Sequence, residues 1–168
     1  SFVGIENPIE LHEAIYRKYR ETGSPNNLTI VSSAGFGEWD ENRNAESYIR
    51  EGAVSKLICG HFGAMLSTKK LVLQDRFEAY NLPLGCISHA TRAQAGGIPG
   101  ALSKGGLDIF VDPRIDGPGI NKISKDDSLV KLVEVDNEEF VHVAFPIIKK
   151  LFKIFLLCSS KELCRLDC

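Results

Sequence analysis

The sequence predicts a single α/β domain with an open, mostly parallel sheet flanked by helices and an antiparallel β-hairpin near its end. Two observations predict this fold class. Short β-branched runs alternate with segments whose apolar residues recur at helical spacing, which is the pattern of βαβ units. The chain has 168 residues, 43% of them hydrophobic and 25% charged, which suits one globular domain with its own core.

The first half of the chain is expected to alternate helix and strand. A helix is predicted over 7–22, with Asn7 as a possible cap and Pro8 suited to the first helical position. Gly23 followed by Pro25 ends this helix. The next expected elements are a strand at 28–31, a short helix at 45–51, a strand at 56–59 and a helical segment within 62–75.

The second half of the chain continues the alternation and then changes to a hairpin. The expected elements are a strand at 77–82 that stops at Pro83, a helix at 87–95, a glycine-rich loop at 96–100, a strand at 109–111 and a hairpin formed by 129–135 and 140–145. Strands separated by helices imply parallel pairing, because parallel neighbours need a long crossover connection. The hairpin turn is expected at Asp136-Asn137-Glu138.

Composition excludes several classes of protein. The net charge of -2 leaves no basic footprint for nucleic acid. There is no run of 18 apolar residues for a transmembrane helix, no visible signal peptide and no Cys/His cluster with metal spacing. The five cysteines are an odd number, which argues against a disulfide framework and favours a reducing compartment, the cytoplasm or the mitochondrial matrix.

Glycine-rich loops follow the predicted strands, and open α/β sheets bind ligands beyond the carboxyl ends of their strands. These loops are 34–37, 60–63, 83–85 and 104–106. None of them contains the Walker A pattern or a complete G-x-G-x-x-G. A turn role is the commoner explanation for any one of these glycines, so the residues alone predict an α/β domain with glycine-lined ligand loops.

Several side chains in these regions allow two interpretations. His61 is either a proton-transfer group or, more commonly, a hydrogen-bonded loop residue. His89 and Arg92 lie three residues apart and form either an anion site or a solvated helix face. Cys59 and Cys86 are interpreted as buried structural thiols, because no histidine base has a recognisable spacing to either.

Three stretches, in order, resemble signature segments of the family I coenzyme A transferases. Residues 2–8 resemble the end of the Gly-Gly-Phe signature, and Asn81-Leu82-Pro83-Leu84-Gly85 resembles the Asn-Leu-Pro-Gln-Gly segment. Residues 96–106 and 110–114 are similar to the family's following loop and strand. Gly60-His61-Phe62-Gly63 and Glu51-Gly52 lie where acetate and propionate members carry Gly-His-Trp-Gly and Glu-Gly. The resemblance extends from Ser1 to about Ile147.

The resemblance implies a Rossmann-like α/β domain of an enzyme that moves coenzyme A from an acyl-CoA to a short-chain carboxylate. Such enzymes act in short-chain fatty acid and ketone body metabolism, have two similar domains or subunits, and form homo-oligomers at full length. A glutamate of the second domain becomes a glutamyl-CoA thioester, while backbone N–H groups and an amide stabilise the oxyanion. The coenzyme A thioester is a substrate, and no permanently bound cofactor is expected. The positions implied to contact substrate or coenzyme A are Gly4, Leu84, Gly85, Gly100 and Gly106.

The chain departs from the family pattern in four places. Ser1 stands where a glycine is expected, and Glu6 replaces a later glycine of the same signature. Leu84 stands where the family usually has a glutamine that binds the carboxylate or its oxyanion. No Ser-Glu-Asn-Gly-like motif occurs in the 168 residues, so no catalytic residue is expected in this chain and the chain alone is expected to be inactive. A non-catalytic binding or assembly module with the same fold is the alternative, whereas sugar-phosphate isomerases share only the broad architecture.

Charge and cysteine content change near residue 147. The first 147 residues have a net charge of -5, whereas 148–168 have a net charge of +3 and three of the five cysteines. We therefore divide the chain into a partial N-terminal coenzyme A transferase domain, 1–147, and a divergent tail, 148–168. The tail is interpreted as a frameshift product, as an ordinary terminal helix or as an amphipathic membrane-surface anchor.

Overall fold

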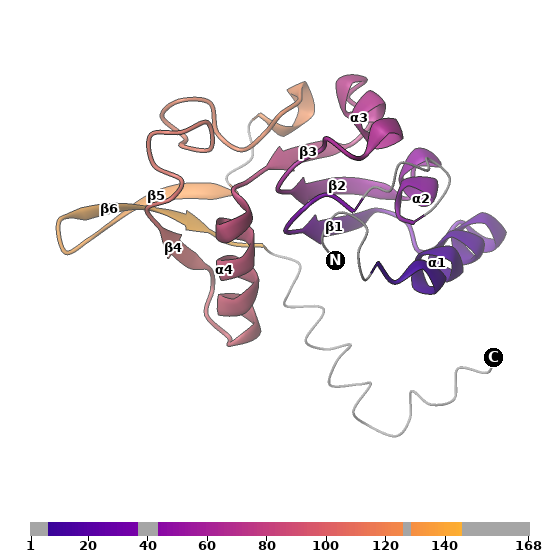
Figure 1. Ribbon diagram of the computed structural model, residues 1–168, viewed down its shortest axis with the longest axis horizontal. Helices are drawn as coiled ribbons and strands as arrows, with labels where there is room; N and C mark the ends of the chain where they lie inside the picture. Colours follow the sequence, from indigo (N-terminus) through magenta and orange to yellow (C-terminus); the bar gives the residue numbers. More distant parts are fainter. Residues whose placement is uncertain (1–6, 37–43, 126–128, 146–168) are drawn as a thin grey trace.

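The computed structural model describes residues 7–36, 44–125 and 129–145. These residues form two small sheets with helix α4 between them (Figure 1). The first sheet is parallel with strand order β1-β2-β3, and the second is antiparallel with order β4-β6-β5. The predicted α/β class with a parallel sheet and a late hairpin is confirmed, and the hairpin forms its own sheet together with β4. The predicted boundary at 147 and the tail lie outside the described residues.

The helices and strands follow one another in the order that the sequence periodicity predicts, with two additional short elements and without the predicted strand at 109–111. The bounds are α1 Ile9–Thr22, β1 Leu28–Ser32, α2 Glu46–Arg50, β2 Val54–Cys59, α3 Leu66–Leu73, β3 Glu78–Asn81, α4 Leu84–Ala95, β4 Ala101–Ser103, a 3₁₀ turn Lys122–Ser124, β5 Val130–Val135 and β6 Glu138–Val143. No helix in the described part of the chain is long and apolar enough to cross a membrane.

The side chains of the first sheet alternate between two cores, as the twofold period of a strand requires. On one face, Leu57 of β2 and its register partners Ile30 and Ala79 pack against α1, α2 and α3. On the other face, Ile58 and Tyr80 pack against Ile87 of α4 and against the second sheet. The sheet is therefore covered by helices on both faces, as is usual for parallel sheets.

Two local signals from the sequence are confirmed by the backbone. Gly23 ends α1 in the left-handed region, with φ of 69°, and its N–H donates to the carbonyl oxygen of Tyr19 at 2.7 Å. The hairpin turn lies where it was predicted but is one residue shorter: it consists of Asp136 and Asn137, and Glu138 begins β6. Both turn residues have positive φ, which is the type I′ geometry that fits the twist of two paired strands.

The start of α1 differs from the prediction. Pro8 occupies the cap position and the helix begins at Ile9, so Asn7 is not the cap. The Asn7 side chain instead contacts Nε2 of His12 at 3.0 Å and donates to the carbonyl oxygen of Phe36 at 3.4 Å. These longer-range contacts use the amide that a cap would have needed.

The predicted strand at 109–111 is wrong. The buried carboxylate of Asp112 accepts the N–H groups of Asp108 and Arg114, at 3.1 and 2.9 Å, and folds this segment into turns. The guanidinium of Arg114, 2.7 Å from Asp112, holds the pKa of this carboxyl well below its usual range. Phe110 remains 43% exposed, so the short apolar run does not become a buried strand.

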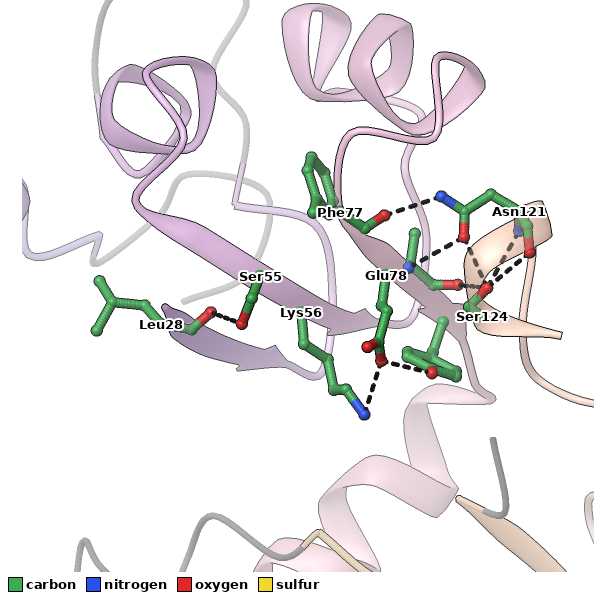
Figure 2. A network of polar contacts seen from close by, with 9 residues as sticks. Leu28, Ser55, Lys56, Phe77, Glu78, Asn121 and Ser124 are labelled. Carbon is green, nitrogen blue, oxygen red and sulfur yellow. Dashed lines mark hydrogen bonds and ion pairs between the residues drawn. The ribbon is translucent and has the colours of Figure 1, made fainter. Parts of the chain in front are cut away.

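The outer edge of β3 is covered by the segment that leads to the 3₁₀ turn (Figure 2). The amide of Asn121 donates to the carbonyl oxygen of Phe77 at 2.8 Å, and its Oδ1 accepts the N–H of Ala79 at 3.4 Å. Ser124 Oγ donates to the carbonyl oxygen of Ala79 at 2.9 Å, and Tyr80 forms an antiparallel bridge with Gly119. These contacts satisfy polar groups of β3 that would otherwise face solvent.

Candidate functional site at the strand ends

The carboxyl ends of β1, β2 and β3 meet at one edge of the first sheet, next to the N-terminus of α4 (Figure 1). We call this place the strand-end site and define it by Ser33, Gly35, Gly60, His61, Asn81, Leu84 and Gly85. In open parallel sheets this edge is the usual position of the ligand. Three of the four glycine-rich loops singled out in the sequence contribute to it.

Asn81 joins the ends of β2 and β3. Its Nδ2 donates to the carbonyl oxygens of Cys59 at 3.1 Å and Gly60 at 2.8 Å. The N–H of Leu82 donates to the same Cys59 carbonyl oxygen at 3.2 Å. These bonds hold the turn from β3 into α4, and they therefore determine where the first turn of α4 lies.

The ends of β1 and β2 approach so closely that a side chain at Gly60 would clash with the backbone and one at Gly35 would displace His61. A Cβ on Gly60 would lie 2.2 Å from the carbonyl oxygen of Ser33, which is backbone and does not move easily. A Cβ on Gly35 would lie 2.9 Å from Cε1 of His61, whose Nε2 accepts the N–H of Gly35 at 3.3 Å. His61 is thus hydrogen-bonded within these loops, as the commoner of its two interpretations predicts.

The N-terminus of α4 opens onto the strand-end site. Pro83 occupies the cap position without a side-chain cap, and its carbonyl oxygen accepts the N–H of Ile87 at 3.2 Å. The first N–H groups of a helix have no carbonyl partner within that helix, and those of Leu84 and Gly85 are among them here. Both residues are exposed, Leu84 by 44%, and no atom lies within 4 Å of a Cβ built on Gly85. The positive end of the helix dipole makes this turn suitable for a carboxylate or an oxyanion.

The predicted start of this helix, at residue 87, was three residues too late. Leu84-Gly85-Cys86 form its first turn, because Pro83 provides a ready start and Cys86 packs into the core. A glycine in that turn weakens the helical signal of the sequence, which explains the difference.

The two described cysteines are buried and free, as their interpretation as structural thiols predicts. The thiol of Cys59 donates to the carbonyl oxygen of His61 at 3.1 Å. Burial raises the pKa of Cys59 to about 12, so this thiol is protonated at neutral pH. A protonated thiol is a weak nucleophile, and Cys59 therefore has a packing role at the end of β2.

The remaining candidates lie away from the first turn of α4. His89 and Arg92 are exposed on the surface of α4, as a solvated helix face predicts. Gly100 follows the other end of α4, about 18 Å along the helix, and a Cβ there would lie 2.4 Å from Nε2 of His142. Gly106 is packed against Val141, 2.6 Å from the position of a Cβ. Close packing explains both glycines, whose contact with substrate stays a prediction, and Gly4 lies outside the described residues.

Sequence reasoning did not select Asn81 or Ser33 as site residues. The signal that identifies them is their position at the carboxyl ends of parallel strands. Ser33 also lies near α4, with its Oγ 3.4 Å from that of Ser88. Among the described residues there is no group of three or more His, Cys, Asp or Glu side chains that could hold a metal ion.

Comparison with known proteins gives consistent matches to one family. Residues 1–144 match the family model described as Coenzyme A transferase. The chain is 38% identical over 139 residues to acetate CoA-transferase YdiF of Escherichia coli (strain K12), a match that covers 83% of the chain and 26% of YdiF. It is 37% identical over 134 residues to caffeate CoA-transferase of Acetobacterium woodii, covering 80% of the chain and 25% of that relative.

Solved structures agree with the sequence matches. The acyl-CoA transferase YdiF of E. coli O157:H7, as a thioester complex with CoA, superposes with a TM-score of 0.74 and 36% identity, over 82% of this chain and 26% of that one. Its apoenzyme gives a TM-score of 0.72 at 38% identity, over 80% and 26%. The chain thus spans about a quarter of the length of the relatives that it matches.

Proposed function

Because the chain belongs to the coenzyme A transferase family, we propose that it is the N-terminal part of an enzyme that moves coenzyme A between an acyl-CoA and a short-chain carboxylate. The observation that carries this proposal is the exposed first turn of α4 at the strand-end site, formed by the segment that resembles the Asn-Leu-Pro-Gln-Gly signature. One relative is an acetate CoA-transferase, another a caffeate CoA-transferase, and the YdiF structure is a thioester complex with CoA.

In the proposed reaction, the N–H groups of Leu84 and Gly85 bind the oxygen of the substrate carboxylate or of the thioester carbonyl. Such donors act where negative charge develops in the transition state. A glutamate of a second domain or subunit, outside these 168 residues, attacks the acyl-CoA carbonyl, which expels the CoA thiolate and forms an acyl-glutamyl anhydride. The thiolate then attacks the glutamyl carbonyl, which forms the glutamyl-CoA thioester and releases the acyl group as its free carboxylate. Gly4, Gly100 and Gly106 are further proposed contacts, which rest on the family resemblance alone.

The proposal also covers the domain organisation, the partner and the compartment of the enzyme. Residues 1–147 are its partial N-terminal domain, and the partner is a second coenzyme A transferase domain or subunit. We place the full-length homo-oligomer in the cytoplasm or the mitochondrial matrix, in short-chain fatty acid or ketone body metabolism. The two described cysteines are free thiols, which is compatible with either reducing compartment.

A non-catalytic binding or assembly module with the same fold is the second candidate function. The observation that favours it is Leu84, whose apolar side chain is 44% exposed at the first turn of α4 and offers no hydrogen-bond donor there. In an acyl-transfer site, the absence of one such donor costs about 10²–10³ in rate. The two candidates differ in whether the chain supports transfer when the missing domain is supplied.

The test is to add the rest of YdiF, beyond its matched quarter, to this chain and to measure transfer of coenzyme A from acetyl-CoA to propionate. Calorimetric titration of acetyl-CoA into the chain, alone and in the mixture, measures binding separately. The transferase proposal predicts transfer in the mixture and none by either part alone. Binding of acetyl-CoA without transfer in the mixture would support the non-catalytic module, and absence of both would reject the two candidates together.

A further inference from the structure

The loop that follows β1, residues 33–36, forms one side of the strand-end site. The carbonyl oxygen of Ser33 lies 2.2 Å from the place of a Cβ on Gly60, and that of Leu82 lies 3.7 Å from the same place. The Oγ atoms of Ser33 and Ser88 are 3.4 Å apart, which brings the loop against α4 as well. The position of this loop therefore determines how closely the strand ends meet at the site.

His61 holds this loop from the end of β2. Its Nε2 accepts the N–H of Gly35 at 3.3 Å, and a Cβ on Gly35 would lie 2.9 Å from its Cε1, so the ring lies directly against the loop backbone. A ring nitrogen accepts a hydrogen bond only when it has no proton, and the neutral ring therefore carries its proton on Nδ1. The neighbouring titratable group is the thiol of Cys59, which donates to the carbonyl oxygen of His61. Burial raises the pKa of Cys59 to about 12, so this neighbour is uncharged at neutral pH.

His12 of α1 holds the end of the same loop, at Phe36, and it does so through Asn7. The Nδ2 of Asn7 donates to the carbonyl oxygen of Phe36 at 3.4 Å, and its Oδ1 lies 3.0 Å from Nε2 of His12. Because an amide oxygen can only accept, Nε2 of His12 must carry a proton. The neutral ring then accepts at Nδ1, which lies 2.9 Å from the hydroxyl oxygen of Tyr48 in α2.

The surroundings of His12 favour its neutral form. α1 and α2 lie side by side (Figure 1), and the ring centroids of His12 and Tyr48 are 5.8 Å apart. Tyr48 is 3% exposed, and burial raises its pKa to about 12, so the hydroxyl keeps the proton that it donates. Glu10 and Glu13 of α1 are exposed, and the described lining of the cavity beside His12 has no charged side chain. Burial lowers the pKa of His12 accordingly.

Both histidines match their contacts only as neutral rings, because an imidazolium donates from both nitrogens. On His61, a proton on Nε2 would face the N–H of Gly35, and the two donors would repel each other. On His12, a proton on Nδ1 would face the hydroxyl of Tyr48, which would have to turn its own proton towards buried surroundings. The contacts of the loop thus require one particular neutral tautomer of each histidine.

We propose that His12 and His61 are positioning residues of the strand-end site, which fix the loop 33–36 at two points. His12 does so as the Nε2–H tautomer, through Asn7, and His61 does so as the Nδ1–H tautomer, through the N–H of Gly35. Each residue acts on the backbone of the loop and not on a reacting atom. The tautomers follow from these contacts alone, whereas their consequence for coenzyme A transfer rests on the proposed function.

The tautomers are measured by long-range proton–nitrogen NMR of the 168-residue chain labelled with nitrogen-15, because the shifts of the ring nitrogens distinguish Nδ1–H from Nε2–H. The variants His12→Gln and His61→Gln assign the signals. At about pH 7.5, His12 should be the Nε2–H tautomer and His61 the Nδ1–H tautomer. As the pH falls to about 5, the amide proton of Gly35 should shift together with the protonation of His61, and in His61→Gln it should not shift.

Substitutions separate the hydrogen bonds from packing. Glutamine keeps a donor and an acceptor at the end of its side chain, whereas leucine has neither. Amide hydrogen exchange in the loop 33–36, measured by mass spectrometry, should be about tenfold faster or more in His12→Leu and in His61→Leu. In the two glutamine variants it should stay within about threefold of the parent. His89→Leu, at an exposed position of α4, is the matched control and should leave exchange in the loop unchanged.

Two results would overturn the proposal. One is the opposite tautomer, or a mixture of tautomers, for either histidine, and this measurement on the parent decides the matter even where a leucine variant does not fold. The other is exchange in the loop that is equally fast in the leucine and glutamine variants.

The mixture with the rest of YdiF tests the consequence for the reaction. The leucine variants should transfer coenzyme A at least about tenfold more slowly than the glutamine variants, because a displaced loop misplaces the strand-end site. Equal rates would overturn the positioning role. A parent mixture without transfer would count against the proposed function, and the tautomers would still decide this proposal, so the two are tested separately.

Discussion

Replacing Asn121 by alanine is expected to lower the free energy of unfolding by about 3 kcal/mol. The side chain is 8% exposed and connects the 3₁₀ segment to the outer edge of β3 (Figure 2). Its amide donates to the carbonyl oxygens of Phe77 at 2.8 Å and Val72 at 3.3 Å, and its Oδ1 accepts the N–H of Ala79 at 3.4 Å and lies 2.7 Å from Ser124 Oγ.

The magnitude follows from the partners that lose a bond. Ser124 Oγ keeps the carbonyl oxygen of Ala79, so its loss is small. The carbonyl oxygen of Phe77 and the N–H of Ala79 lose their partner at a buried edge, and each unsatisfied group costs about 1–3 kcal/mol. Because Ala79 N–H makes the longer bond, we take a total of about 3 kcal/mol, which corresponds to a decrease in Tm of roughly 6–12 °C.

The measurement is urea unfolding monitored by circular dichroism. The slope m, which is the dependence of the free energy of unfolding on urea concentration, must be the same for all variants. Lys122→Ala, at the exposed neighbouring position, is the matched control and should stay within about 0.5 kcal/mol of the parent. Asn121→Asp keeps an acceptor but loses both donated bonds, and it should be at least as destabilised as Asn121→Ala. An Asn121→Ala variant within about 0.5 kcal/mol of the parent would refute the assigned role of this side chain.

Three further predictions concern the strand-end site and α1. Gly60→Ala places a Cβ 2.2 Å from the Ser33 carbonyl oxygen and should lower the free energy of unfolding, measured with urea, by about 1–3 kcal/mol. Gly85→Ala is the control, because the space around Gly85 is open, and it should not destabilise the protein. Equal losses of stability in the two variants would contradict this prediction. Burial lowers the pKa of His12, so the folded state binds a proton more weakly than the unfolded state, and the free energy of unfolding should fall as pH drops through 6.5 and below. His12→Gln should remove that part of the pH dependence, and an unchanged slope between pH 7.5 and 5 would show that His12 is not responsible. Leu84→Gln, which adds a side-chain donor at the first turn of α4, should raise transfer in the YdiF mixture by about 10²-fold; an unchanged or lower rate would count against the proposed oxyanion position.

Local signals in the sequence were sufficient for most of the secondary structure. Gly23 ends α1 and Asp136-Asn137 form the hairpin turn, because each needs only the backbone conformation of one or two residues. The same reasoning failed for 109–111, an apolar run that becomes turns because the Asp112 carboxylate binds the backbone on both sides of it. It also missed β4 at Ala101–Ser103, three residues long, which is a strand only because β6 lies beside it.

The candidate site shows the same division. The sequence by itself determined the α/β class, the order of most of the elements and the family, since these depend on periodicity and on short motifs such as Asn81 to Gly85. Only the tertiary structure decided that Ser33, Gly60 and Leu82 come together while Gly100 and Gly106 pack against β6. It also decided that the segment before and within the 3₁₀ turn covers the outer edge of β3. The meeting of these loops and the covering of a sheet edge depend on contacts between residues far apart in the chain. The pattern of residues within one segment has no information about which distant segments will lie beside it.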